Sequence, residues 1–272
     1  MRALQKDNIV NLFVGIDDLL PQRVQPGRLS ALTDSEMLTI LIWDGLTEPH
    51  KNLSSVHSWI AREYHDYFPG LPRYQNFVAH CHRLMPVFIQ ILQSLLAVDA
   101  KLRFADSTML PVCKPVRVNS HRVARDVADM GKNHQCWHYG FKLHAAIDHL
   151  GRLAAFVFTP ANIYDGQLLV RLVNEATRVV VGDSHYGAGT TRKTIRDQYE
   201  GVVIIAPPHY KQNKQVMAKW QHLLLMMRPK IEAMFGKLKE QAYLVSSFPR
   251  SVRGYFVHYL RVLLGYQVRA NS

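Results

Sequence analysis

Three acidic residues occupy positions where the surrounding pattern alone would place apolar or neutral side chains. Asp106 lies within an alternating run that predicts a β-strand, and Asp183 directly follows a short buried run. Glu232 lies in a helical stretch that Pro229 opens. A lone carboxylate at any of these positions is most simply a cap or an ion-pair partner. Three of them in the most basic part of the chain indicate a metal site.

The chemistry that such a site suits is cleavage of a phosphodiester. At neutral pH the attacking oxygen must be activated and the leaving oxygen stabilised, and two Mg²⁺ ions roughly 3.5–4 Å apart do both. Mg²⁺ prefers oxygen ligands and is usually held by one or two carboxylates. We therefore expect Asp106, Asp183 and Glu232 to be the catalytic residues and the ligands of two Mg²⁺ ions, which Mn²⁺ can replace. Without metal, their mutual repulsion should raise carboxylate pKa values.

Two cations share a helix face with Glu232. Arg228 comes four residues before it and Lys239 seven residues after it. This spacing suits a metal ligand flanked by contacts to DNA phosphate. The alternative is a solvated i,i+4 pair on a surface helix.

The segment that carries these residues, 99–272, predicts an α/β domain with a mixed sheet. A strand at 102–110 is followed by a hairpin with arms at 137–148 and 151–159. Beyond it, apolar periodicity predicts helices and strands in alternation. The helices are expected at 167–176, 190–199, 214–227, 229–243 and 252–268, and the buried strands at 178–182 and 202–206.

Residues 1–98 predict a small all-helical domain. The sequence Thr33-Asp-Ser-Glu36 is a capping box ahead of an apolar run, and further helical runs cover 53–64 and 73–96, with Pro86 as a kink. Helices on either side of the Pro-Gly turn could form a helix-turn-helix in which Arg73 contacts DNA. An ordinary helical bundle with a polar face is the equal alternative.

Charge and composition indicate a polyanionic partner. The chain has 272 residues, with 33 Lys and Arg against 21 Asp and Glu. Residues 1–100 hold 8 basic and 10 acidic residues, so the excess lies in residues 101–272, with 25 against 11. Three dispersed cysteines, the lack of an apolar signal core and the lack of a membrane-length apolar run predict a soluble, cytoplasmic protein.

Five segments together resemble the DDE transposases of bacterial insertion sequences. They are Asp106-Ser-Thr, Tyr139-Gly-Phe-Lys-Leu-His144, Thr159-Pro-Ala-Asn-Ile-Tyr-Asp165, Gly182-Asp-Ser-His-Tyr-Gly187 and Arg228-x3-Glu232-x6-Lys239. The resemblance implies an RNase H-like fold with Asp106, Asp183 and Glu232 as the acidic triad, and Phe235 as a packing aromatic. The signature often has Tyr three residues before the Arg, where this chain has Leu225.

Several neighbouring residues have two interpretations each. Lys142, near His144 on a predicted strand, is either a DNA phosphate contact or an exposed lysine. Asp165 is most simply an N-cap. His185 and Tyr186 either contact substrate or pack in the loop. His134, Cys136 and His138 alternate but have no fourth ligand at a suitable spacing, so zinc is rejected.

These expectations together predict a transposase acting at the bacterial nucleoid. It would bind the terminal inverted repeats of its element, cleave at the ends and join the freed 3′-OH to target DNA, with at least a dimer in the synaptic complex. The N-terminal helices would recognise the ends or dimerise. The alternatives are a structure-selective nuclease on the same fold and a DNA-binding derivative without catalysis.

Overall fold

The chain folds as two compact units, seen in the computed structural model, which describes residues 7–20, 30–133, 136–208, 217–245 and 249–271. Unit 1 comprises Met1–Leu95 and Glu240–Ser272, and unit 2 comprises Leu96–Lys239. The last helix therefore packs with the N-terminal helices, whereas the sequence predicted that it would belong to a domain spanning 99–272. The described helices include none long and apolar enough to cross a membrane.

Unit 1 is helical in its described residues. Its elements are α1 (Asp7–Leu19), α2 (Asp34–Leu46), α3 (Leu53–Glu63), α4 (Tyr74–Arg83), α5 (Met85–Ser94) and α10 (Val252–Asn271). The capping box predicted at Thr33 is present, with Glu36 N donating to Thr33 Oγ1 at 3.1 Å and Thr33 N to Glu36 Oε2 at 2.6 Å. The run predicted at 73–96 divides at Leu84, two residues before Pro86, which lies in the first turn of α5.

The position of α10 in unit 1 follows from its burial. Every residue from Val257 to Gly265 is buried, so the helix has no solvent-facing stripe over this stretch. It packs on α2 and α5. A helix that is buried all round needs neighbours on every side, and the N-terminal helices supply them.

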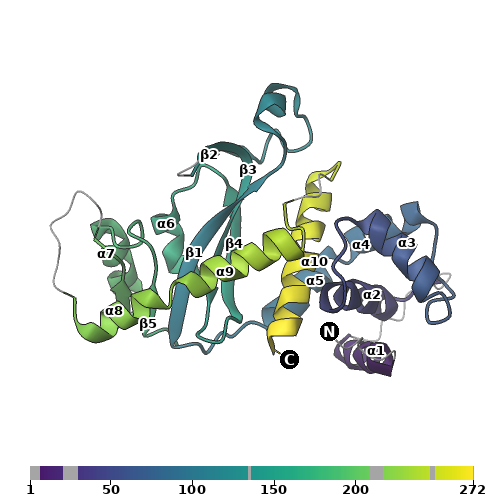
Figure 1. Cartoon of the computed structure of the whole chain (residues 1–272), viewed down its shortest axis with the longest axis horizontal. Helices are drawn as coiled ribbons and strands as arrows, with labels where there is room; N and C mark the ends of the chain where they lie inside the picture. Colours follow the sequence, from purple (N-terminus) through teal and green to yellow (C-terminus); the bar gives the residue numbers. More distant parts are fainter. Residues whose placement is uncertain (1–6, 21–29, 134–135, 209–216, 246–248, 272) are drawn as a thin grey trace. The chain divides into compact units, whose positions relative to one another are not determined.

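Unit 2 is built on one mixed sheet (Figure 1). Its strands are β1 (Leu102–Pro111), β2 (Asp129–Lys132), β3 (Trp137–Ile147), β4 (Leu153–Pro160), β5 (Val179–Val181) and β6 (Val203–Ile205). β3 lies antiparallel to β1, and β5 and β6 continue parallel to β1 on its other side. β2 and β4 flank the same side of β3, β2 beside residues 137–140 and β4 beside residues 141–147.

The remaining elements of unit 2 surround this sheet. They are the 3₁₀ helix η1 (Pro115–Ser120), α6 (Asp165–Leu172), α7 (Gly189–Gln198), α8 (Lys219–Met226), α9 (Pro229–Gly236) and the π-helical turn Lys237–Gln241, which crosses into unit 1. α6 packs on β4, β3 and β1, and α9 packs on β1. Buried apolar side chains of β5, β6, α6 and α7 form one core.

Two elements of unit 2 differ from the sequence prediction. The strand β2 was not predicted, and α6 ends at Leu172 rather than at Ala176. The early end of α6 has a local cause, because Asn174 leaves the helix and its amide donates to Val98 O at 2.8 Å, while Thr177 Oγ1 donates to Asn174 Oδ1 at 3.1 Å. The first residues predicted for the helix at 214–227 and His134 of the rejected zinc motif lie outside the described residues.

Candidate active site

Adjacent parallel strands bring Asp106 and Asp183 close together. Phe104 of β1 is paired with Val181 of β5, and each aspartate lies two residues further along its strand direction. Asp183 follows the carboxyl end of β5, the place where open α/β sheets bind their ligands, whereas Asp106 lies within β1. Extending the register by two residues places the two aspartates side by side, and the charge of Asp183 acts on the pKa of Asp106.

Asp106 is a largely buried carboxylate, with 16% of its side chain exposed. Its Oδ1 accepts from Ser107 N at 2.8 Å, and its Oδ2 lies 3.5 Å from Arg228 Nη2. Burial raises the pKa of Asp106 to about 6, against the lowering effects of the Ser107 N–H and Arg228, and the charges of Asp183 and Asp165 raise it further. The direction is the one expected from the sequence, but burial rather than repulsion between carboxylates is the main cause.

Asp183 is oriented by the turn that follows β5. Its Oδ1 accepts from His185 N at 2.9 Å, and its Oδ2 lies 2.8 Å from His185 Nδ1. Gly182 permits this turn, since a Cβ there would lie 2.5 Å from the ring of Tyr186. Tyr186 is 1% exposed, which fits the packed-loop interpretation. His185 is half exposed and holds the aspartate.

Arg228 joins the third carboxylate to the first. Its Nη2 lies 3.1 Å from Glu232 Oε1 and 3.5 Å from Asp106 Oδ2, so one nitrogen contacts acids on α9 and β1. The i,i+4 pair predicted as an alternative is therefore present, but it is not simply a solvated surface pair. Arg228 Nε is buried and has no hydrogen-bond partner among the described residues.

Lys239 also faces this cluster. Burial lowers the pKa of its ammonium, and the charge of Asp106 partly offsets that effect. It lies in the π-helical turn Lys237–Gln241, a backbone form that is frequent at functional sites. Arg228 and Lys239 thus both act on Asp106 of β1, and Glu232 is joined to it through Arg228.

A second buried cluster lies beside the first and corrects two predictions. Lys142 is 8% exposed, and its Nζ donates to Asp165 Oδ1 at 2.9 Å and to Ile163 O at 2.8 Å. The exposed-lysine alternative is therefore wrong, and internal acceptors take two of the three ammonium donors; the contact to DNA phosphate stays a prediction. Asp165 is not the N-cap, because Tyr164 takes that position without a side-chain cap bond. Asp165 instead neutralises Lys142, which the sequence pattern does not reveal because the partners lie on different elements.

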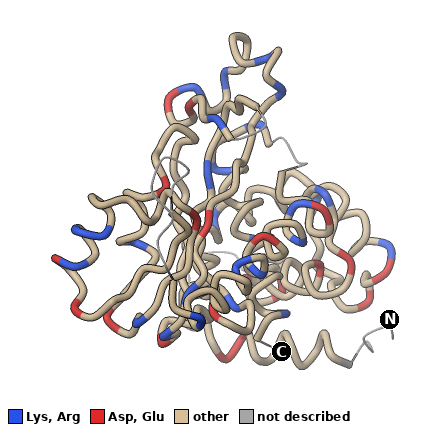
Figure 2. Tube along the Cα trace, turned by 60° about the vertical axis from the view of Figure 1, so that its left-hand side comes forward, with Lys and Arg blue, Asp and Glu red and all other residues tan. Residues whose placement is uncertain are grey.

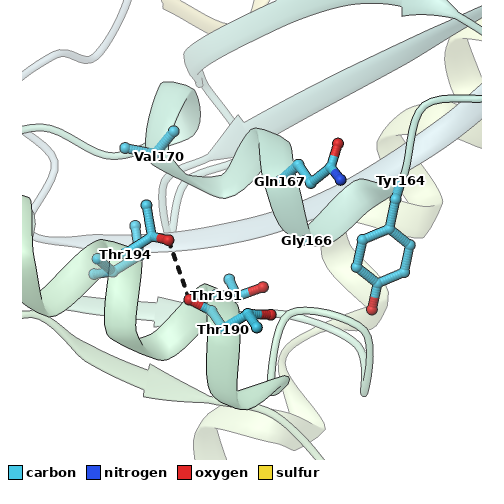
Figure 3. Close-up of a pocket in the computed structure, with 8 residues that line it drawn as sticks. Tyr164, Gly166, Gln167, Val170, Thr190, Thr191 and Thr194 are labelled. Carbon is cyan, nitrogen blue, oxygen red and sulfur yellow. Dashed lines mark hydrogen bonds between the residues drawn. The ribbon is translucent and has the colours of Figure 1, made fainter.

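A cavity of about 260 Å³ opens between the first turns of α6 and α7 (Figure 3). Its lining is uncharged and consists of Tyr164, Gly166, Gln167, Val170, Thr190, Thr191, Thr194 and Ile195. Tyr164 links it to the Asp183 turn, since its Oη donates to His185 O at 3.1 Å. The wall has hydroxyl and amide groups but no charged side chain.

Arg73 lies in unit 1, at the start of α4. It is exposed, as are the next three residues, Tyr74, Gln75 and Asn76. The connection from Glu63 to Tyr74 is longer than the three or four residues of a usual helix-turn-helix turn. His80 further along α4 is buried, with Nε2 2.7 Å from Asp34 Oδ1.

No group of three or more His, Cys, Asp or Glu side chains within the described ranges is arranged to hold a metal ion. Arg228 contacts both Asp106 and Glu232. Cys136 Sγ lies 3.3 Å from His138 Nε2, and the third member of that motif, His134, lies outside the described residues.

Comparisons with known proteins point to one family. The sequence matches the family described as "Transposase DDE domain" over residues 97–252. Among solved structures, the fold is similar to that of a piggyBac transposase in a synaptic complex with hairpin DNA, with a TM-score of 0.50, 8% identity, and coverage of 97% of this chain and 72% of that chain. No curated protein matches. The family match spans more than half of the sequence, and the chain therefore belongs to the transposase DDE domain family.

Proposed function

We propose that this protein is an insertion-sequence transposase that cleaves DNA at the ends of its element and joins the freed 3′-OH to target DNA. The observation that carries the proposal is the proximity of Asp106 on β1 to Asp183, which follows the neighbouring parallel strand β5, with Glu232 joined to Asp106 through Arg228. Family membership supplies the reaction class, and these three residues are the proposed catalytic acids.

The carboxylate set suits two Mg²⁺ ions, or Mn²⁺ in their place. Carboxylate oxygens are the ligands that Mg²⁺ prefers. Burial and two nearby aspartates raise the pKa of Asp106 to about 6. A cation bound beside Asp106 would therefore stabilise its ionised form. A bound divalent cation would supply activation of the attacking oxygen and stabilisation of the leaving oxygen.

The basic residues have separate roles in this proposal. Arg228 contacts two acids, and its planar fork suits a bidentate contact to phosphate. We infer that Arg228 and Lys239 hold the DNA strand whose phosphate reacts. His185 positions the Asp183 carboxylate through the two hydrogen bonds described above.

The remaining features of the proposal concern architecture and partners. The sheet, with its antiparallel first strands followed by the parallel β5 and β6, supports an RNase H-like fold. Two element ends must meet in one complex, so at least a dimer is expected, at the nucleoid of a bacterial cell. The exposed first turn of α4 with Arg73 is the proposed place where unit 1 contacts element-end DNA.

The decisive experiment measures strand cleavage and joining with Mg²⁺ or Mn²⁺ by purified protein. The substrates are duplexes from the DNA that flanks its reading frame. Glu232→Gln should reduce both products by at least about 10³-fold, since a ligand and charge of the site are lost. Glu175→Gln, an exposed glutamate before β5, is the matched control and should retain full activity.

The outcomes separate the alternatives. Cleavage at one position with joined product, both lost in Glu232→Gln, supports the transposase. Cleavage without joining indicates a nuclease. Specific binding by a well-folded protein with neither product indicates a DNA-binding derivative, and would overturn the proposal.

A further inference from the structure

The connection between β1 and β2 forms a projecting arm, residues 112–128, beyond the end of the sheet (Figure 1). Its base is anchored, since Val112 N donates to Tyr139 O at 3.0 Å and Ala124 is 1% exposed. Its outer part is the 3₁₀ helix η1, which buries none of its residues and leaves Val116 87% exposed. The arm is thus fixed at its base and open to solvent at its tip.

The arm carries cations that have no acidic partner. Lys114, Arg117, Arg122 and Arg125 are all exposed, and the arm's sequence contains one acid, Asp126. Within the described part of the chain, no carboxylate lies within 4.0 Å of any of these four cations. Figure 2 shows the basic residues spread over this uppermost loop. By contrast, Arg228 and Arg261 each contact carboxylates.

Four unpaired cations on a small projection suit a regularly charged polyanion. Duplex DNA presents one charge per ~1.7 Å of helix axis, and basic side chains that contact it release condensed counterions. Arginine, three of the four residues, binds phosphate in a bidentate manner. These contacts would position DNA without reading its sequence.

The distance from the base of the arm to Asp106 follows from the geometry of β1. It begins after Pro111, five residues beyond Asp106 on β1, and a strand advances about 3.3 Å per residue. The base of the arm is therefore roughly 16 Å from Asp106 along the strand. At ~3.4 Å per base pair, this distance corresponds to about five base pairs of duplex.

We propose that residues 112–128 form a DNA-clamping arm that contacts backbone phosphates of the duplex about five or more base pairs from the phosphate that reacts. The inference rests on the proposed function, because the reacting phosphate is the one placed at Asp106. The arm would be a DNA-binding surface separate from the acidic cluster. Its contacts would set the length of flanking duplex that the enzyme requires.

The test compares two triple variants of the full-length protein. Arg117→Ala/Arg122→Ala/Arg125→Ala removes three arm cations. The control variant Lys101→Ala/Arg171→Ala/Arg196→Ala also removes three exposed cations. Lys101 precedes β1, and Arg171 and Arg196 lie near the C-terminal ends of α6 and α7, away from the arm. Both variants lose the same net charge, so a difference between them reports position. Circular dichroism checks that both are folded.

Binding to duplex DNA is measured as a function of salt concentration. The arm variant should bind roughly tenfold or more weakly and lower the slope of log K against log salt by roughly 2 to 3, about 0.9 per lost phosphate contact. The control variant should stay close to wild type. On duplexes trimmed to fewer than about five base pairs on the arm's side, wild type and arm variant should bind alike.

The failures are distinguishable. If the arm variant keeps the wild-type slope, or weakens binding no more than the control variant, the arm inference is overturned while wild-type cleavage and joining still stand. If wild-type protein neither cleaves nor joins DNA, the proposed function itself fails. Loss of self-association with unchanged DNA slope would indicate a protein-contacting arm and also overturn the inference.

Discussion

His144 is a buried imidazole whose charge state depends on two neighbours of opposite sign. Its ring is fully buried, with Nε2 2.9 Å from Thr159 Oγ1 and Nδ1 3.6 Å from Asp165 Oδ1. Burial lowers the pKa of His144 to about 4; Asp165 acts to raise it and Lys142 to lower it. The shorter Lys142–Asp165 contact, 2.9 Å, explains why the imidazole does not gain the carboxylate as its partner.

Replacing Lys142 should therefore change the titration of His144. In Lys142→Met the repelling ammonium is absent and Asp165 is free to pair with the ring, so the pKa of His144 should rise from about 4, while burial still keeps it below its ordinary value of ~6.5. NMR titration of the histidine ring signals measures this value. Lys101→Met, an exposed lysine before β1, is the control and should leave it unchanged.

The same substitution has a consequence for stability against pH. A histidine whose folded pKa is depressed stabilises the fold fully above ~6.5, and this contribution is lost as pH falls toward about 4. In Lys142→Met the acid loss assigned to His144 should be smaller than in wild type. A His144 pKa that stays near 4 in the variant would mean that burial alone sets it.

At the scale of elements, α2 and α10 cross at a pair of glycines. A Cβ built on Gly45 would lie 2.6 Å from Gly265 Cα, and one built on Gly265 would lie 2.8 Å from Gly45 Cα. Real Cβ atoms do not approach backbone this closely. The two helix backbones therefore pack in direct contact, and any side chain at the crossing forces them apart.

We expect Gly45→Ala and Gly265→Ala each to destabilise unit 1, despite the better helix propensity of alanine. Overpacking a tight contact costs about 1–3 kcal/mol, against a gain of roughly 1 kcal/mol from propensity. Gly15 in α1 is the matched control, because a Cβ there meets nothing within 4 Å. Gly15→Ala should stabilise, as judged by urea unfolding followed by circular dichroism. Equal gains at all three glycines would contradict the close packing.

The sequence predicted what depends on local pattern. The capping box at Thr33 and the alternation around Asp106 depend only on neighbouring residues, so the sequence predicted both α2 and β1. The register that brings Asp106 beside Asp183 follows from adjacent parallel strands. The catalytic roles of these residues and of Glu232 remain predictions that the activity assay tests.

What the sequence did not predict depends on partners distant along the chain. Asp165 resembles an N-cap until Lys142 is seen beside it. The strand β2 is four residues long, Asp-Met-Gly-Lys, and has no apolar alternation, so only its pairing with β3 identifies it. The burial of α10 on all sides reflects helices that precede it by more than 150 residues.

At the scale of the whole molecule, unit 1 is assembled from both ends of the sequence. Arg261 Nη1 contacts Asp44 Oδ2 across 217 residues, and Arg261 Nη2 donates to His50 O at 2.8 Å. Both charged side chains are almost fully buried. Burial raises the pKa of Asp44 even though Arg261 and His50 act to lower it, so the carboxylate depends on its cation to remain ionised.

Removing the Arg261 side chain should destabilise α2 and α10 together. Arg261→Met leaves a buried carboxylate without its ion-pair partner, which typically costs about 3–5 kcal/mol. Because α2 and α10 share this contact and the glycine crossing, hydrogen exchange should accelerate in Asp34–Leu46 and Val252–Asn271 alike. The β1 and β3 strands of unit 2 should keep wild-type exchange, since their hydrogen bonds lie within the other unit. Acceleration limited to α10, or equal acceleration in β1, would show that unit 1 is not a separate cooperative unit built from both ends of the chain.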